Sequence, residues 1–148
     1  MPKPQPQPQP PEARRVLREL ERLGQRTGRY VQQRLAQLDV TDLEVHVLWH
    51  LRKGGQSPAD LLRAFGIQPS TLTGVLDRLE TRGLIRRSRH PTDRRSLLLV
   101  LTPAGQRAAA TVRQVLDGFE AEVRQRVGAA DLAGFFDVAA AVDQVIDG

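Results

Sequence analysis

The sequence predicts a mainly α-helical protein that carries one small β-hairpin. Over most of the chain, apolar residues recur at three- and four-residue spacing, which is the period of an amphipathic helix. In the middle of the chain, two short helical segments are separated by a tight turn that contains glycine. After them come two β-capable runs, "LIRRSR" and "RRSLLLVL", on either side of the turn "HPTD". This arrangement is the pattern of a hairpin.

Length and composition exclude several classes of protein. The 148 residues suffice for one domain with a hydrophobic core. The chain has no cysteine, which excludes disulfides, thiolate metal sites and thiol-based redox sensing. No apolar run approaches the ~18 residues of a membrane span, and the N-terminus lacks the apolar stretch of a signal peptide. We therefore expect a cytoplasmic protein with no membrane partner.

Positive charge is concentrated in one window. The formal net charge is +5 and the isoelectric point is about 10.9. Between Arg78 and Arg95 the chain has seven arginines and two acids, Glu80 and Asp93. A basic cluster of this kind is compatible with a polyanionic partner.

The N-terminal part divides into a tail and a long helix. Residues 1–11, "MPKPQPQPQPP", alternate proline with glutamine, so we expect a disordered or polyproline-like tail. Residues 12–38 follow a helical pattern with Arg, Glu and Gln between the apolar positions. A helix of this length spans ~40 Å, which is more than a small domain buries alone. We therefore expect it to pack against another subunit.

Three helices are expected over residues 41–82. Thr41 is a plausible N-cap of the first, and "KGG" at 53–55 ends it. Ser57-Pro58 begins the second, which ends at Gly66. After the turn "IQP", a helix begins near Ser70 and runs to about residue 82. The last two helices and the turn between them are typical of a helix-turn-helix.

Two more helices follow the hairpin. Thr102-Pro103 is a strong N-cap and first-position pair for a long helix that ends near Gly128. A terminal helix follows it. The expected apolar face of this terminal helix consists of Leu132, Phe135, Phe136, Ala139, Val142 and Ile146.

A helix-turn-helix followed by a basic hairpin is a winged helix-turn-helix, which points to double-stranded DNA as the partner. A helix fits the major groove and presents its N-terminal side chains to base edges. A basic hairpin tip can reach the backbone or a narrow minor groove. We expect Asp93 to orient a neighbouring arginine through a charge-assisted hydrogen bond. The expected DNA-binding residues are Gln68, Ser70, Thr71, Thr73, Gly74 and Arg78 on the helix, and Arg89, Asp93, Arg94 and Arg95 on the hairpin.

The segments "STLTGVLDRLETRGL" and "LIRRSRHPTDRRSLLLVLTPAG" resemble the recognition helix and wing of MarR-type transcriptional regulators. In this resemblance, Asp93 and Arg95 fall on the Asp-x-Arg pair of the wing. It implies a single domain over residues 12–148, with a winged helix-turn-helix at about 40–101 and dimerisation helices at about 12–38 and 102–147. It further implies a homodimer that acts as a ligand-responsive repressor on a pseudo-palindromic operator, reading it through helix 69–82 and wing 86–97.

The resemblance also implies a small-molecule effector between the dimerisation helices and the DNA-binding lobe. For an aromatic or anionic effector, the candidate residues are Arg29, Tyr30, His46, Trp49 and His50. His46 and His50 share a helix face and could ligate a metal, but a third ligand is missing and His90 is expected too far away, on the wing. We expect no metal and no cofactor.

Two other classes of function fit the sequence less well than DNA binding. A winged-helix module that holds a protein partner would use the same fold, but such modules usually lack wing arginines and a Ser/Thr-rich helix start. An enzyme is not expected, because the sequence has no phosphate-binding glycine loop, no Gly-x-Ser-x-Gly and no cysteine nucleophile.

Overall fold

The computed structural model describes residues 15–89, 91–92 and 97–148. Helix α1 (Arg15–Arg34) is followed by the short 3-10 helix η1 (Ala36–Leu38). Next come α2 (Asp42–Leu51), α3 (Pro58–Phe65) and α4 (Pro69–Thr81), then strands β1 (Ile85–Arg89) and β2 (Leu97–Leu101). The long helix α5 (Pro103–Arg126) and α6 (Ala129–Asp147) end the chain. The mainly helical fold with one hairpin is confirmed.

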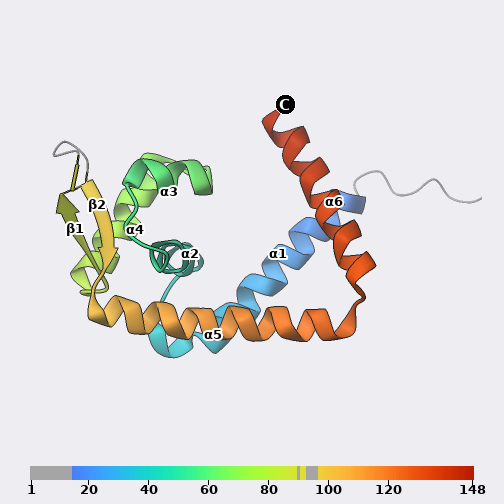
Figure 1. Ribbon diagram of the computed structural model, residues 1–148, viewed down its shortest axis with the longest axis horizontal. Helices are drawn as coiled ribbons and strands as arrows, with labels where there is room; N and C mark the ends of the chain where they lie inside the picture. Colours follow the sequence, from blue (N-terminus) through green and yellow to red (C-terminus); the bar gives the residue numbers. More distant parts are fainter. Residues whose placement is uncertain (1–14, 90, 93–96) are drawn as a thin grey trace, which may run out of the picture.

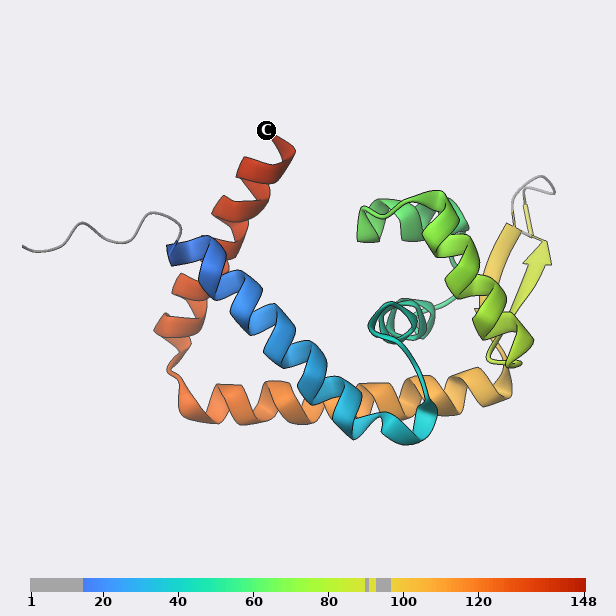
Figure 2. The ribbon, with the colours of Figure 1, turned by 180° about the vertical axis from the view of Figure 1, so that it is seen from behind.

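The molecule has two lobes joined by α5 (Figures 1 and 2). Helices α2, α3 and α4 and the hairpin lie on one side of the N-terminal half of α5, while α1 and α6 lie toward its other end. Strands β1 and β2 pair antiparallel with Ile85 opposite Leu101 and Arg89 opposite Leu97. Gln56, just before α3, adds a single bridge to Leu99. The helix-turn-helix with its wing is therefore one compact lobe.

The core lies inside the winged lobe and along its contact with α1 and α5. Its fully buried aliphatic residues come from every helix of the lobe and from both strands; they include Leu35, Leu48, Leu61, Leu72, Leu79, Ile85, Leu99 and Val112. Most predicted helix starts are confirmed by their hydrogen bonds. The Thr41, Ser57 and Thr102 side chains each accept a backbone N–H, from Glu44, Asp60 and Gly105 respectively.

One helix boundary differs clearly from the sequence expectation. The first helix was predicted to run over 12–38, but α1 ends at Arg34 and the chain tightens into η1 before Asp39, which has a left-handed φ of 47°. Leu35 and Leu38 keep the helical spacing through η1, so periodicity did not reveal the change. The fourth helix begins at Pro69, in agreement with the expected recognition helix 69–82, because proline fits the first helical position and Gln68 is the N-cap.

The remaining expectations fall in three groups. Residues 1–11, with the predicted tail, lie outside the described part of the chain. Within the described part, no helix is long and apolar enough to cross a membrane. The expected apolar face of the terminal helix is present, but Phe135, Phe136 and Ile146 are 55%, 54% and 74% exposed in the single chain. This exposure leaves an apolar surface without a partner in one chain.

Candidate nucleic-acid interface

Helix α4 separates a buried face from an exposed face. Leu72, Leu76 and Leu79 are buried and fix the helix to the core of the winged lobe. The predicted reading residues of the first two turns are all exposed; they are Gln68, Ser70, Thr71, Thr73 and Gly74. The hydroxyl of Thr73 donates to the carbonyl oxygen of Pro69 at 2.9 Å, and its oxygen can still accept a hydrogen bond. The structure therefore brings these five residues together on one accessible surface.

The start of α4 differs from the starts of α2, α3 and α5. Those three helices have a Thr or Ser N-cap whose side chain accepts a backbone N–H. Gln68 makes no such bond, and the first turn of α4 contains no acidic residue. The positive end of this helix therefore has no side-chain acceptor among the described residues. A helix N-terminus in this condition is suited to a phosphate.

Arg78 occupies a different place from the one expected. Its Nε lies 3.1 Å from Oε1 of Glu44, which is 1% exposed, and its Nη2 donates to the carbonyl oxygen of Asp39 at 3.2 Å. Arg82, which the sequence reasoning did not select, donates to the carbonyl oxygens of Asp39 and Leu38. Both guanidinium groups therefore hold parts of the protein together. A sign of this role was present in the sequence, because Glu44 occupies a buried position of its helix and a buried carboxylate needs a cation beside it.

The wing is attached to α4 by a third arginine. Arg87 on β1 donates to Asp77 at 2.7 Å and also forms an ion pair with Glu80. The hydrogen bond to Asp77, followed by the charges of Glu80 and Asp77, raises the pKa of the Arg87 guanidinium above its ordinary value. Arg87 therefore stays charged and joins the hairpin to α4.

The hairpin also carries arginines that point outward. Arg86 and Arg89 are exposed on β1, and no ion pair joins either of them to another described residue. The other predicted wing residues, Asp93, Arg94 and Arg95, lie outside the described part of the chain, as does His90. Arg89 stands at the end of β1, next to the tip. Among the exposed arginines of β1, Arg89 is therefore the one nearest in sequence to those residues.

The five effector candidates do not share one pocket. Tyr30 packs against Phe119, with Arg34 3.8 Å above its ring, and with Arg29 it lines a shallow hollow on α1. Trp49 lies beneath the guanidinium of Arg52, 3.7 Å from it. The described residues contain no cluster of three or more metal-ligating side chains.

The two histidines share a helix face but face different surroundings. The His50 ring packs edge-on against Phe65, and its Nδ1 lies 3.0 Å from the carbonyl oxygen of His46. Of the five effector candidates, His46 is the one that lines a mainly apolar groove of about 440 Å³ between α1, α2, α5 and α6. Sequence reasoning missed the other lining residues, since they come from four helices; they include Leu20, Val31, Leu116 and Phe135.

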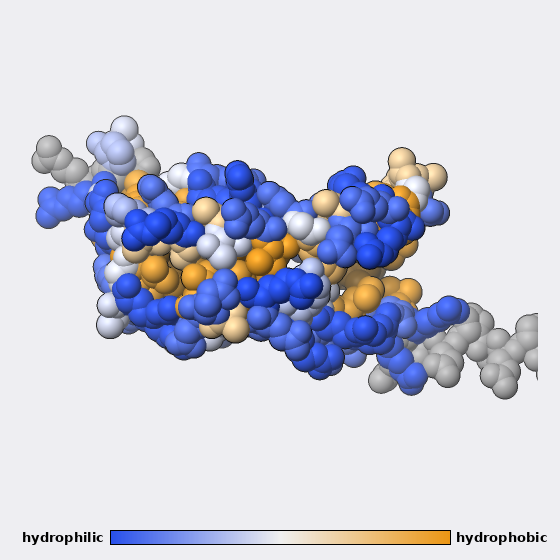
Figure 3. Space-filling view, turned by 90° about the horizontal axis from the view of Figure 1, so that it is seen from below, coloured by the Kyte–Doolittle hydropathy of each residue, from blue (hydrophilic) through white to orange (hydrophobic). Residues whose placement is uncertain are grey.

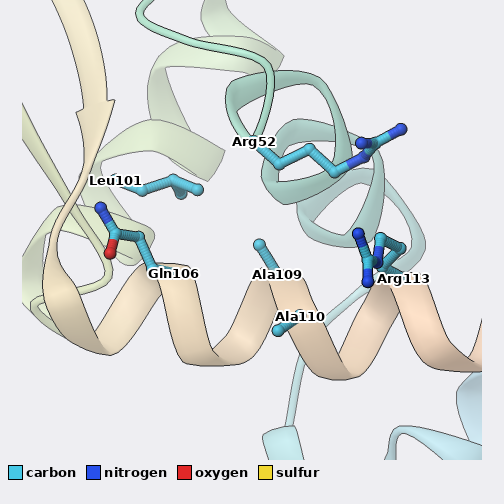
Figure 4. A pocket seen from close by; sticks show the side chains of 6 residues that line it. All are labelled: Arg52, Leu101, Gln106, Ala109, Ala110 and Arg113. Atoms are coloured by element: carbon cyan, nitrogen blue, oxygen red, sulfur yellow. The ribbon is translucent and has the colours of Figure 1, made fainter.

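A second hollow lies between the end of α2, the end of β2 and α5 (Figure 4). It has a volume of about 310 Å³. Ala109 and Ala110 of α5 form its floor, with Leu101 and Gln106 at one end and the guanidinium groups of Arg52 and Arg113 at the other. The mixture of apolar floor and two cations suits a small anion. Nε of Arg113 also lies 3.7 Å from Oδ2 of Asp117, one turn further along α5.

Helices α1 and α6 expose apolar side chains at the end of the molecule away from the wing. Figure 3 shows apolar surface at this end of the molecule and a larger apolar area toward the wing side. On α1 these residues are Val16, Leu17, Leu20 and Leu23; on α6 they are Phe135, Phe136, Val138, Val145 and Ile146. Val145 is 84% exposed. A group of exposed apolar side chains of this kind marks an interaction site.

The winged lobe is similar in sequence to known proteins. The model of the MarR family matches residues 40–97, which cover α2 through the beginning of β2. This part of the chain is therefore similar to the MarR family. The curated protein MarR of Salmonella typhimurium is 34% identical over 84 residues, which are 56% of this chain and 58% of that protein. The chain thus matches a little over half the length of this MarR relative.

Two solved MarR-type structures extend the likeness beyond the matched segment. A mutant of MarR from E. coli, complexed with operator DNA, is 25% identical with a TM-score of 0.73. The alignment covers 86% of this chain and 92% of that one. BpsR of Bordetella bronchiseptica, whose DNA binding is regulated by 6-hydroxynicotinic acid, is 26% identical with a TM-score of 0.74. Here 91% of this chain and 98% of that one are covered. The MarR-type fold therefore includes α1, α5 and α6.

Proposed function

We propose that the protein is a dimeric, sequence-specific DNA-binding transcriptional regulator of the MarR type, a ligand-responsive repressor that acts in the cytoplasm and is not an enzyme. The observation that carries this proposal is the first half of α4. Its polar residues are exposed together, its N-terminal amides have no side-chain acceptor in the part of the chain that the structure describes, and its opposite face is buried in the core. This is the arrangement that a helix needs in order to enter a major groove.

We propose the following division of roles. Ser70, Thr71 and Thr73 offer hydroxyls to base edges or phosphates, and Gly74 lets the DNA approach the helix. Gln68 stands at the N-cap, where its amide can reach the backbone. Arg89 and the tip residues Arg94 and Arg95 meet phosphate or the minor groove, with Asp93 orienting one of them. Arg78 is assigned a different role below.

The proposed dimer is built from α1, α5 and α6, within a single MarR-like domain over 12–148. Burying the exposed apolar residues of α1 and α6 against a second copy would stabilise the pair by the hydrophobic effect. A two-fold dimer would place two α4 helices in successive major grooves, ~34 Å apart. The operator is accordingly expected to be pseudo-palindromic.

Selection of random duplexes against the purified full chain tests the function. Enrichment of one inverted repeat would support the regulator. If no sequence is enriched, the regulator proposal fails and the alternative, a winged-helix module that binds a protein, takes its place. Selection is preferable to testing a single chosen promoter, because it requires no assumption about the operator.

The wing is tested by substitution. Arg95→Ala and Arg89→Ala are each expected to weaken operator binding by ~1–3 kcal/mol and to lower the salt dependence by about one phosphate contact. Arg124→Ala is the matched control, since this arginine lies on α5 and pairs with Glu120. Unchanged midpoints for both wing variants in titrations at two salt concentrations would remove the wing from the mechanism.

We propose that an aromatic or anionic effector enters the groove lined by His46, Leu116 and Phe135. This groove lies between the dimerisation helices and the winged lobe, so an occupant would contact both. BpsR, whose DNA binding responds to 6-hydroxynicotinic acid, supports this class of ligand. Calorimetry with 6-hydroxynicotinic acid should detect binding that Leu116→Trp abolishes. Equal binding by that variant would place the ligand elsewhere, with the hollow at Arg52 and Arg113 as the next site to test.

A further inference from the structure

Glu44 is a buried carboxylate that the proposed DNA contacts do not use. It lies in the first turn of α2 and is 1% exposed. Its Oε2 accepts the backbone N–H of Thr41 at 2.8 Å and so completes the cap of α2. Its Oε1 is buried without a hydrogen bond from the described residues, and Nε of Arg78 lies 3.1 Å from it. The carboxylate thus joins α2 and α4 through a charge pair.

Burial makes this pair sensitive to the loss of either partner. A carboxylate removed from water is costly unless a cation compensates it. The guanidinium of Arg78 supplies that charge while 46% of its side chain remains exposed. If Arg78 turned outward to reach a phosphate, Glu44 would lose its counter-charge. The energetic preference is therefore for Arg78 to remain on Glu44.

The same face of α4 also holds the segment that connects α1 to α2. Nη2 of Arg78 and Nη1 of Arg82 donate to the carbonyl oxygen of Asp39, at 3.2 Å and 2.7 Å. Arg82 also donates to the carbonyl oxygen of Leu38, in η1. Asp39 adopts its left-handed conformation at the point where the chain leaves η1 for α2. Two arginines one turn apart on α4 therefore hold the connection between α1 and α2.

We infer that Glu44, Arg78 and Arg82 form a latch that fixes α4, the proposed recognition helix, to the connection between α1 and α2. In the latch, Glu44 is a positioning residue for DNA recognition although it does not face DNA. The inference rests on the proposed function: in a dimer, the separation of the two α4 helices depends on how firmly each is joined to its own α1. A loose latch would disturb the match to two half-sites and leave attraction to phosphates intact.

Glu44→Gln separates this inference from simple electrostatics. The variant keeps the shape of the side chain and removes one negative charge, so charge alone predicts tighter binding to any DNA. The latch predicts the opposite for the operator: a Kd raised about tenfold or more, corresponding to the loss of a charge-assisted contact. Binding to random duplex should stay equal or tighten. Glu122→Gln is the matched control, because it removes the same charge from an exposed i,i+4 pair on α5.

Arg82→Ala provides a second variant in case Glu44→Gln does not fold, which circular dichroism would show. Arg82 is exposed and bonds backbone carbonyls, so its loss leaves no buried charge. The latch predicts weaker operator binding with an unchanged salt slope. A phosphate contact by Arg82 would instead lower the slope by about one unit for operator and random duplex alike, which would overturn the inference.

Amide hydrogen exchange of the free protein measures the latch without DNA. Faster exchange along α4 in both variants is expected, with α6 unchanged. If the wild type selects no duplex, the regulator proposal fails, and the exchange experiment still decides whether the latch exists. Wild-type exchange in both variants, or operator binding by Glu44→Gln as tight as that of Glu122→Gln, would refute it.

Discussion

Gly105→Ala tests the close contact between the first turn of α5 and the chain just before β1. A Cβ at this position would lie 1.8 Å from the carbonyl oxygen of Leu84 and 2.8 Å from its carbonyl carbon. Carbon and oxygen atoms normally rest ~3.3–3.6 Å apart, so the two backbones would have to separate by more than about 1 Å. The same carbonyl oxygen accepts the N–H of Thr102 at 3.1 Å, and that hydrogen bond would be broken.

These terms give the expected magnitude. Forcing an extra methyl into a packed contact costs ~1–3 kcal/mol, and the lost hydrogen bond costs ~0.5–1.5 kcal/mol. Alanine recovers up to about 1 kcal/mol through its higher helix propensity. The net destabilisation is therefore about 0.5–4.5 kcal/mol. For a domain of this size, that corresponds to a fall in Tm of roughly 1–18 °C.

Thermal unfolding followed by circular dichroism measures the effect. Protein concentration must be held constant, since a dimer's Tm depends on it. Gly118→Ala is the matched control on the same helix, because no atom lies within 4 Å of the added Cβ. Its Tm should be unchanged or slightly raised. A Tm for Gly105→Ala within about 1 °C of the wild type would show that α5 and Leu84 are not in close contact.

Three further predictions concern the cap, the wing and the dimer. Ser57→Ala should lower the free energy of unfolding in urea by about 1 kcal/mol, because α3 loses its N-cap. The hydrogen bond from the Ser57 hydroxyl, then that from its N–H, holds the pKa of Asp60 below its ordinary value. The contribution of ionised Asp60 to the free energy of unfolding is therefore fully present above the ordinary aspartate pKa, and it is lost as the pH falls through the lowered pKa of the folded protein. An NMR titration that finds the pKa of Asp60 at or above its ordinary value would contradict this. Arg87→Ala should speed amide exchange across both strands, because the wing loses its acidic partners on α4, whereas Arg86→Ala should not; equal rates in the two variants would refute the tie. Phe136→Asp should sediment as a monomer at micromolar concentration, since it places a charge on the exposed apolar face of α6, and a dimer of undiminished stability would move the interface elsewhere.

The parts of the fold that the sequence predicts well are those set by local chemistry. Thr41, Ser57 and Thr102 cap helices because a hydroxyl three residues before an amide satisfies it without help from distant residues. Gly66 ends α3 in the left-handed conformation that favours glycine. The end of α1 at Arg34 was not predictable in this way, because the chain passes directly into η1, whose C-cap Asp39 adopts the left-handed conformation without being glycine.

The candidate site was predictable only on its outward side. Polarity at the start of α4 indicated the reading residues, since exposed positions of a helix are visible in its periodicity. The role of Arg78 was not, because it depends on Glu44, a residue far away in the sequence. For the same reason, Arg82 and Arg87 counted toward the basic window although each has partners within the protein. Net charge in a segment therefore overstates how many cations are available for phosphate.

The two faces of α4 have a consequence for altering which DNA the protein prefers. The positions that anchor α4 in the core, which are leucines, are separate from the exposed positions that carry hydroxyl side chains. Substitutions at exposed positions usually change stability by less than about 0.5 kcal/mol. Ser70, Thr71 and Thr73 could therefore be randomised together in a library, and nearly every member would still fold. New operator preferences could be selected from this scaffold without redesigning its interior.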